Sequence, residues 1–71
     1  MNIVSSTKLR SNLAEALKKV SKEKYLLISK RGKVGFAILD YKYLINILKG
    51  AGNTSYEDLE KQRLELEGVY K

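Results

Sequence analysis

The secondary structure of this chain is organised around residues 25–39, which read Tyr-Leu-Leu-Ile-Ser-Lys-Arg-Gly-Lys-Val-Gly-Phe-Ala-Ile-Leu. Two apolar runs, 25–29 and 34–39, flank a basic turn at 30–33 that contains a glycine. Apolar runs joined by such a turn are typical of a β-hairpin, because glycine adopts positive φ without steric cost. The stretch therefore predicts two antiparallel strands. Gly35, inside the second of them, predicts a β-bulge or the close approach of another backbone.

Helical patterns lie on both sides of the hairpin. After a short predicted strand at 2–4, residues 7–22 show apolar side chains at helical spacing, and the hydroxyl side chains at 5–7 can cap this helix. Downstream, Asp40 is placed to cap a second helix over 41–48. The apolar stripe of the first helix consists of Leu9, Leu13, Ala16, Leu17 and Val20.

The segment 50–55 predicts a break or hinge, because it holds two glycines among small polar residues. A capping box of Thr54 and Glu57 then predicts a third helix over 56–71. A helix this short is marginally stable in isolation, so its apolar side chains need a surface to pack against. One narrow stripe along it consists of Tyr56, Leu59, Arg63, Leu66 and Tyr70, whereas Leu64 lies off this stripe.

Composition restricts the ways in which so short a chain can be stabilised. The 71 residues include no Cys and no His, which excludes disulfides and thiolate zinc sites and leaves only scattered carboxylates as charged metal ligands. Oligomerisation is the remaining means, and we expect a homodimer. Without a His or Cys, a glycine-rich phosphate loop or a carboxylate pair in an apolar setting, we expect no enzymatic activity and no cofactor. The absence of Cys, of a ~20-residue apolar span and of a signal-peptide pattern predicts a soluble, cytoplasmic protein.

Charge is distributed unevenly along the chain. The net charge is +6, to which residues 1–50 contribute +8, from eleven Lys and Arg against three acidic residues, and residues 51–71 contribute −2, from three against five. A basic body suits a polyanion such as nucleic acid, and dimerisation would double its charge. A generic basic surface is the alternative. The acidic tail suggests a second partner of different character.

The order of these elements, β-α-β-β-α and then a further helix, resembles that of the Phd/YefM family of antitoxins. The resemblance covers residues 1–48 and includes a Ser/Thr-rich step into the first helix, an Arg-x-x-Leu-x-x-x-Leu pattern within it, an Arg-x-Gly-type turn and an Asp cap. Residues 41–44, Tyr-Lys-Tyr-Leu, stand where the family often has an acidic pair before a tyrosine. The residues that carry the resemblance are Ser5, Ser6, Thr7, Arg10, Asn12, Leu13, Leu17, the turn 30–33 and Asp40.

This resemblance implies an α+β fold in which residues 1–49 form a dimerisation and DNA-binding domain, 50–55 a hinge and 56–71 a toxin-binding amphipathic helix. Dimers of the family bind palindromic operator DNA, and their tails fold against a toxin, commonly a RelE-fold ribonuclease or a Fic-fold enzyme. The implied function is that of an antitoxin in a type II toxin–antitoxin system, which neutralises its toxin and represses their shared promoter.

For operator DNA, Arg10 and Arg31 are the first candidates, because a guanidinium can reach a base edge or clamp a phosphate and both match basic positions that the family uses for DNA contact. The lysines near them are expected to neutralise phosphates. Helix capping is the alternative role for Ser6 and Thr7, and Asn12 can satisfy local backbone groups instead. The predicted DNA-binding residues are Ser6, Thr7, Lys8, Arg10, Ser11, Asn12, Lys30, Arg31 and Lys33.

For the toxin, the apolar and aromatic side chains at helical spacing on the tail are the candidate anchors, and the acidic residues beside them suit a basic toxin such as a ribonuclease. Arg63 is expected to pair with acidic groups of the toxin. The alternatives are that this helix packs on the protein's own dimer, or that the chain is a stand-alone transcriptional regulator or a structural interaction protein. The predicted toxin-binding residues are Tyr56, Leu59, Arg63, Leu66, Val69 and Tyr70.

Overall fold

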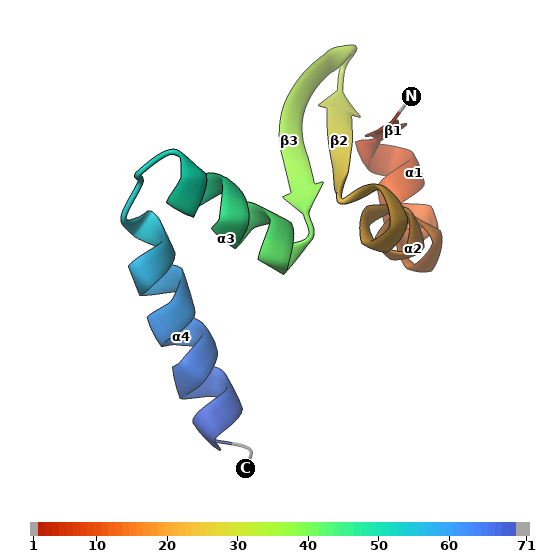
Figure 1. The fold of residues 1–71 in the computed structure, drawn as a ribbon. Helices are drawn as coiled ribbons and strands as arrows, with labels where there is room; N and C mark the ends of the chain where they lie inside the picture. The colour runs from red at the N-terminus through yellow and green to blue at the C-terminus, as the bar shows by residue number, and fades with distance from the viewer. Residues whose placement is uncertain (1, 70–71) are drawn as a thin grey trace.

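The structure, a computed structural model that describes residues 2–69, contains a three-stranded sheet and four helices (Figure 1). In chain order the elements are β1 (Ile3–Ser5), α1 (Ser6–Ser11), α2 (Leu13–Glu23), β2 (Tyr25–Lys30), β3 (Lys33–Leu39), α3 (Tyr41–Gly50) and α4 (Ser55–Val69). The predicted α+β class and the predicted order of strands and helices are confirmed, except that the first helix is divided in two.

The sheet has the strand order β1-β2-β3, with β1 parallel and β3 antiparallel to the central strand β2. The predicted hairpin between β2 and β3 is confirmed. Its turn consists of Arg31 and Gly32, whose φ angles are 54° and 77°. Positive φ at both central residues characterises the type I′ turn, whose twist matches that of the flanking strands.

The predicted bulge at Gly35 is also confirmed. Ile28 of β2 pairs with Phe36. The next residue of β2 pairs with Val34 rather than with Gly35, which is therefore the extra residue in the ladder. A Cβ atom built on Gly35 would meet no other atom of residues 2–69 within 4 Å, so the second explanation, a close backbone approach, does not apply within this chain.

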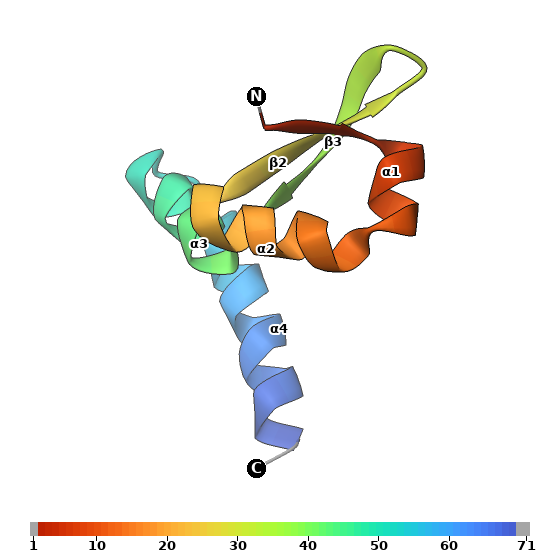
Figure 2. The same ribbon diagram turned by 90° about the vertical axis from the view of Figure 1, so that its right-hand side faces the viewer.

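The prediction of one continuous helix over 7–22 is wrong, because the chain leaves the helical conformation at Asn12, where φ is −145° and ψ is 54°. The backbone N–H of Asn12 still donates to the carbonyl oxygen of Lys8 at 3.0 Å and so ends α1, whereas its own carbonyl accepts from Ala16 and begins α2. Ser11 contributes to the break, since its hydroxyl donates to the Lys8 carbonyl at 3.1 Å. As a result, α1 and α2 point in different directions (Figure 2).

The hydrophobic core is small and lies between α2 and β2. Ala16 and Val20 of α2 pack on Leu26 of β2, which is 1% exposed. Leu13 and Leu17, which belong to the predicted stripe, are each 52% exposed instead. The partly buried side chains around this core are those of Val4, Leu9 and Ile38.

Strand β3 lies at the edge of the sheet and is largely uncovered. α1 and α2 pack over β1 and β2 and leave β3 without a helix beside it (Figures 1 and 2). Phe36 is consequently 62% and Val34 53% exposed. An apolar edge strand of this kind is a template for contact with another chain.

Helix α3 begins at the predicted cap, because the backbone N–H of Tyr43 donates to Asp40 Oδ1 at 3.1 Å. It extends to Gly50, further than the predicted end at Leu48.

The predicted hinge is an ordered helix cap. Gly52 has a φ of 69°, and its N–H donates to the carbonyl oxygen of Lys49 at 3.1 Å. The N–H of Asn53 donates to the carbonyl oxygen of Leu48 at 2.9 Å. These two bonds, with glycine in the left-handed region, form a Schellman motif, so residues 51–54 have a defined conformation that fixes the direction of α4.

Helix α4 begins without the predicted capping box. The N–H of Ser55 donates to Asn53 Oδ1 at 2.9 Å. The N–H of Glu57 donates at 2.9 Å to the backbone carbonyl of Thr54. The predicted capping box required this N–H to donate to the hydroxyl oxygen of Thr54 instead. From there α4 packs on α3 and then extends away from the sheet (Figures 1 and 2). None of the helices formed by residues 2–69 has the length and apolar character that crossing a bilayer requires.

Candidate nucleic-acid and protein interfaces

The two segments predicted to bind DNA, 6–12 and 30–33, meet at one end of the sheet. β1 runs parallel to β2, with Ser5 opposite Ser29. α1 follows directly after β1, and the hairpin turn follows directly after β2, so both start from the same end of the sheet (Figure 2). Parallel pairing therefore brings together two segments that are distant in the sequence.

This end of the sheet is strongly basic. Residues 2–14 and 24–39 contain no Asp or Glu. Within the part of the chain that the structure describes, no carboxylate forms an ion pair with the cations of these two segments. Their guanidinium and ammonium groups are free to meet phosphates, and an arginine can also read a base edge. The exposed cations at this end are Lys8, Arg10, Lys30, Arg31 and Lys33.

Arg31 occupies a turn position that ordinarily favours another residue. Its φ of 54° lies in the left-handed region, which costs a non-glycine residue about 1–2 kcal/mol. Asn, Asp and Gly are the usual choices at this position of a type I′ turn. A side chain that is kept against a local preference, at the tip of a hairpin, is a candidate for function. The DNA contact of Arg31 stays a prediction.

The small polar side chains of α1 differ in their availability. Ser5 caps α1, since its hydroxyl oxygen accepts from a backbone N–H of the first turn at 3.1 Å, so the capping role considered for Ser6 and Thr7 belongs to Ser5. The hydroxyl of Ser11 donates to a backbone carbonyl of its own helix. Thr7 and Asn12 are exposed, and Ser6 is half-buried. Thr7 and Asn12 are thus the better placed of these candidates for contact with DNA.

A separate surface is apolar. Leu13 and Leu17 of α2, together with Val34 and Phe36 of β3, are each at least 52% exposed. Large exposed apolar side chains on an edge strand, and on a helix that packs against the central strand, indicate a protein–protein contact, particularly beside a core this small.

The tail residues predicted to bind a toxin fall into two groups. One group is half-buried, on the side of α4 that packs on α3, and consists of Tyr56, Leu59 and Arg63. Leu66, by contrast, is 61% exposed, as is the off-stripe Leu64 at 59%. Val69 is the last residue of α4, and Tyr70 lies outside the described residues.

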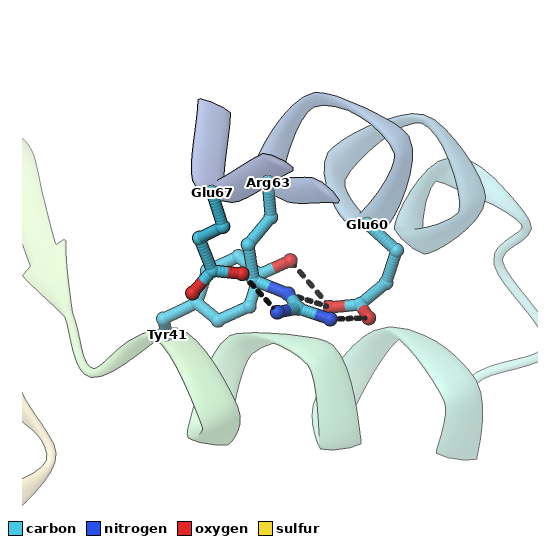
Figure 3. A network of polar contacts seen from close by, with 4 residues as sticks. All are labelled: Tyr41, Glu60, Arg63 and Glu67. Carbon is cyan, nitrogen blue, oxygen red and sulfur yellow. Dashed lines mark hydrogen bonds and ion pairs between the residues drawn. The ribbon is translucent and has the colours of Figure 1, made fainter. Parts of the chain in front are cut away.

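A polar network joins the start of α3 to the middle of α4 (Figure 3). The Tyr41 hydroxyl donates to Glu60 Oε1 at 2.5 Å. Glu60 also accepts from Arg63, with its oxygens 3.3 Å from Nε and 3.0 Å from Nη2, and Arg63 pairs in addition with Glu67. Arg63 thus forms ion pairs with two carboxylates of its own helix, and these pairs already balance its charge. This geometry does not favour the predicted pairing of Arg63 with acidic groups of a toxin.

The network shifts the pKa values of its members in directions that preserve it. Hydrogen bonds from Arg63, and then from Tyr41, lower the pKa of the Glu60 carboxyl. The bond to Glu60 raises the pKa of the Tyr41 hydroxyl, because deprotonation would place a phenolate against a carboxylate. The hydrogen bond with Glu60 also raises the pKa of the Arg63 guanidinium. Near neutral pH, each group therefore keeps the charge that the network needs.

A second contact holds the start of α4 to the end of α3. Lys49 Nζ lies 5.3 Å from the ring centre of Tyr56, within the range of a cation–π interaction. Ile45 is buried where the two helices meet. The first half of α4 thus contacts α3 near both ends of α3.

Sequence reasoning missed this network, although the sequence carries a signal for half of it. The spacing of Glu60, Arg63 and Glu67 puts both carboxylates within reach of the guanidinium on one helix, which the sequence alone reveals. The part played by Tyr41 was missed. Its contact depends on the angle between α3 and α4, which is set by the cap at 51–54, and the sequence signalled that cap only as a break.

Comparison of the chain with models of protein families, with curated proteins and with solved structures finds no match. Among residues 2–69, no three or more His, Cys, Asp or Glu side chains are arranged to hold a metal ion. What the chain does is therefore inferred from its own residues.

Proposed function

We propose that this chain is the antitoxin of a type II toxin–antitoxin system, of the Phd/YefM kind, and that it acts in the cytoplasm. The sheet end formed by α1 and the turn between β2 and β3 binds operator DNA. A homodimer forms through the uncovered apolar side chains of α2 and β3. The tail binds and neutralises the toxin, and operator binding represses the promoter that both proteins share.

The observation that carries this proposal is the convergence of two basic segments, 6–12 and 30–33, at one end of the sheet. Their five exposed cations have no acidic residue beside them in sequence and no ion-pair partner among residues 2–69. Such a surface suits the phosphate backbone, and Arg10 and Arg31 add the guanidinium groups that can distinguish bases. Both arginines project from ordered backbone, one from a helix and one from a tight turn, which favours defined contacts.

Dimerisation fits both the stability and the DNA binding of the chain. A core of so few buried side chains leaves a monomer marginal, and the exposed leucines of α2 with Val34 and Phe36 of β3 offer the area that a second copy would bury. A two-fold dimer also presents two basic sheet ends to the two halves of a palindromic operator.

A stand-alone transcriptional regulator is the second candidate function. One observation favours it: the first half of α4 packs on α3 of the same chain, with Arg63 already paired, as a helix that serves its own fold would. The two functions differ in whether a protein encoded beside this chain binds it. Co-purification of the full-length chain with the product of the neighbouring reading frame supports the antitoxin, and its failure supports the regulator.

The DNA-binding part of the proposal is tested with Arg10→Ala. We expect about tenfold or greater loss of affinity for a duplex of the promoter region, because a base-reading arginine is worth about 1–3 kcal/mol, and a smaller loss for a random duplex of the same length. Fluorescence anisotropy at fixed salt measures both. Lys18→Ala is the matched control, since Lys18 is exposed on α2 beside Glu15, outside both basic segments. Equal losses of affinity for the two duplexes would show that Arg10 contacts phosphates rather than bases. Unchanged affinity for both duplexes would contradict the proposed DNA-binding surface.

A further inference from the structure

Helix α4 changes abruptly in exposure along its length. On its first half, the side facing α3 is half-buried and consists of Tyr56, Leu59, Glu60 and Arg63. Every residue from 64 to 68 is exposed, with Leu64 at 59% and Leu66 at 61%. Both ribbon views show the end of α4 standing clear of the sheet and of the other helices (Figures 1 and 2).

Three contacts of different kinds hold the first half of α4 in place. The Schellman cap at Gly52 fixes the direction in which the chain leaves α3. Lys49 lies over the Tyr56 ring. The Tyr41 hydroxyl reaches across from α3 to Glu60, which is itself bound by the guanidinium of the next helical turn.

The apolar side of α4 continues past the end of this contact. Leu66 follows Arg63 by three residues and so lies on the same side of the helix, one turn further on. Leu64 borders that side on its other flank, since it follows Glu60 by four residues. Residues 64–69 include two Glu and no Lys or Arg. Glu67 pairs with Arg63, whereas Glu65 has no ion-pair partner among residues 2–69.

We propose that α4 is divided into an anchor, residues 55–63, which remains on α3, and an arm, residues 64–69, which binds the toxin. The inference rests on the proposed antitoxin function. It removes Tyr56, Leu59 and Arg63 from the predicted toxin contacts, keeps Leu66 and adds Leu64. Leu64 and Leu66 are two residues apart and project from different flanks of the helix, which fits an apolar cleft that encloses the arm, and the exposed Glu65 favours a basic rim on the toxin.

This division has an energetic consequence for binding. A tail that folds entirely on its partner must order all of its residues at that moment, which reduces affinity for a given contact area. Here the anchor is already helical, so the arm extends an existing helix and avoids the unfavourable nucleation step. Binding then orders only the last turns of α4.

The anchor is tested on the full chain without a partner, by amide hydrogen exchange. We expect protection in residues 56–63 and little in 64–69. Tyr41→Phe should reduce the protection of the anchor about two- to tenfold, the effect of one lost hydrogen bond, and leave the arm unchanged. Tyr43→Phe is the control, because Tyr43 lies on the same helix and its hydroxyl has no part in the network. Low protection throughout α4 in the wild-type chain would overturn the division.

The arm is tested by calorimetric titration of the full chain with the purified product of the neighbouring reading frame. We expect Leu64→Ala and Leu66→Ala each to weaken binding about tenfold, as buried interface anchors do. Gln62→Ala, an exposed change within the anchor, is the control.

The outcomes separate this inference from the proposed function. If the wild-type chain binds the neighbouring protein and the two leucine variants bind it as tightly as the wild type, the assignment of toxin binding to residues 64–69 is wrong and the antitoxin function stands. If the wild-type chain does not bind it, the antitoxin function falls, and the exchange measurement still decides whether α4 has an anchored half.

Discussion

Arg31 and Arg63 show two opposite uses of the same side chain. Arg31 sits at the tip of a hairpin with a left-handed backbone and no ion-pair partner among residues 2–69. Arg63 is held between two carboxylates of its own helix. A guanidinium that is free, exposed and kept against the local backbone preference is available to a phosphate, whereas one that is already neutralised stabilises the fold. The sequence analysis predicted a binding role for both, for Arg31 from the family resemblance and for Arg63 from its helical stripe, and only the local geometry separates them.

The backbone strain at Arg31 gives a prediction in which stability and function move in opposite directions. Arg31→Gly should raise the free energy of unfolding by up to about 1 kcal/mol, because relief of the left-handed strain exceeds the added freedom of the unfolded chain. The same variant should bind promoter DNA more weakly. Urea denaturation and anisotropy measure the two effects.

Lys33→Gly is the matched control for this substitution. It removes a cation of the same segment at a position where φ is not positive, so it should lower stability by about 0.5–1 kcal/mol, as glycine does within a strand. A fall in stability for both variants would show that the turn is not strained at Arg31.

At the scale of the elements, the cap between α3 and α4 determines how the tail is presented. Gly52→Ala should destabilise the packing of α4 on α3 by about 1–2 kcal/mol, because a side chain at a φ of 69° is strained even though there is room for the Cβ atom. The loss of α4 helix signal in circular dichroism during thermal denaturation measures it.

Gly50→Ala provides the comparison, since Gly50 is the last residue of α3 and its φ is not positive. This change should raise the free energy of unfolding by up to about 1 kcal/mol, as expected for Ala in place of Gly in a helix. Equal effects of the two substitutions would show that the cap does not fix α4.

The network between α3 and α4 predicts that the packing of α4 on α3 depends on pH. Since the pKa of Glu60 in the folded chain lies below its ordinary value of 4.5, its contribution is fully present above pH 4.5 and is lost as the pH falls through the lowered folded value. Amide chemical shifts of residues 56–63 should therefore report weaker packing of α4 on α3 at acidic pH. Glu60→Gln should abolish that transition, whereas Glu67→Gln, which keeps the bond to Tyr41, should retain it. An unchanged titration in Glu60→Gln would assign the transition to another carboxyl.

The elements themselves could largely be predicted, whereas several of their ends could not. The hairpin, the bulge at Gly35 and the cap at Asp40 follow from local residue chemistry, because turns, bulges and N-caps each depend on a few neighbouring residues. The break at Asn12 was missed, since the leucine spacing on either side of it is that of one helix, and a bond from Ser11 to the backbone competes with that spacing. Similarly, the meeting of segments 6–12 and 30–33 follows from the parallel pairing of β1 with β2, which no local pattern specifies.

At the scale of the whole molecule, the uncovered edge strand predicts the oligomeric state. We expect a dimer in sedimentation equilibrium for the wild-type chain and a monomer for Phe36→Glu, because a carboxylate in an apolar interface is costly to desolvate. Leu64→Glu is the control, since Leu64 is similarly exposed but lies on α4. A monomeric wild-type chain, or dissociation of the control, would place the interface elsewhere.

The small core between α2 and β2 has a consequence for gene expression. If burial of the β3 side chains in a dimer completes the fold, the folded fraction depends on how many copies are present, as in obligate dimers. Operator occupancy would then rise more steeply than linearly with the abundance of the chain. We expect a promoter fused to a reporter to switch over a narrow range of expression level, with full transcription below a threshold at which the copies no longer pair.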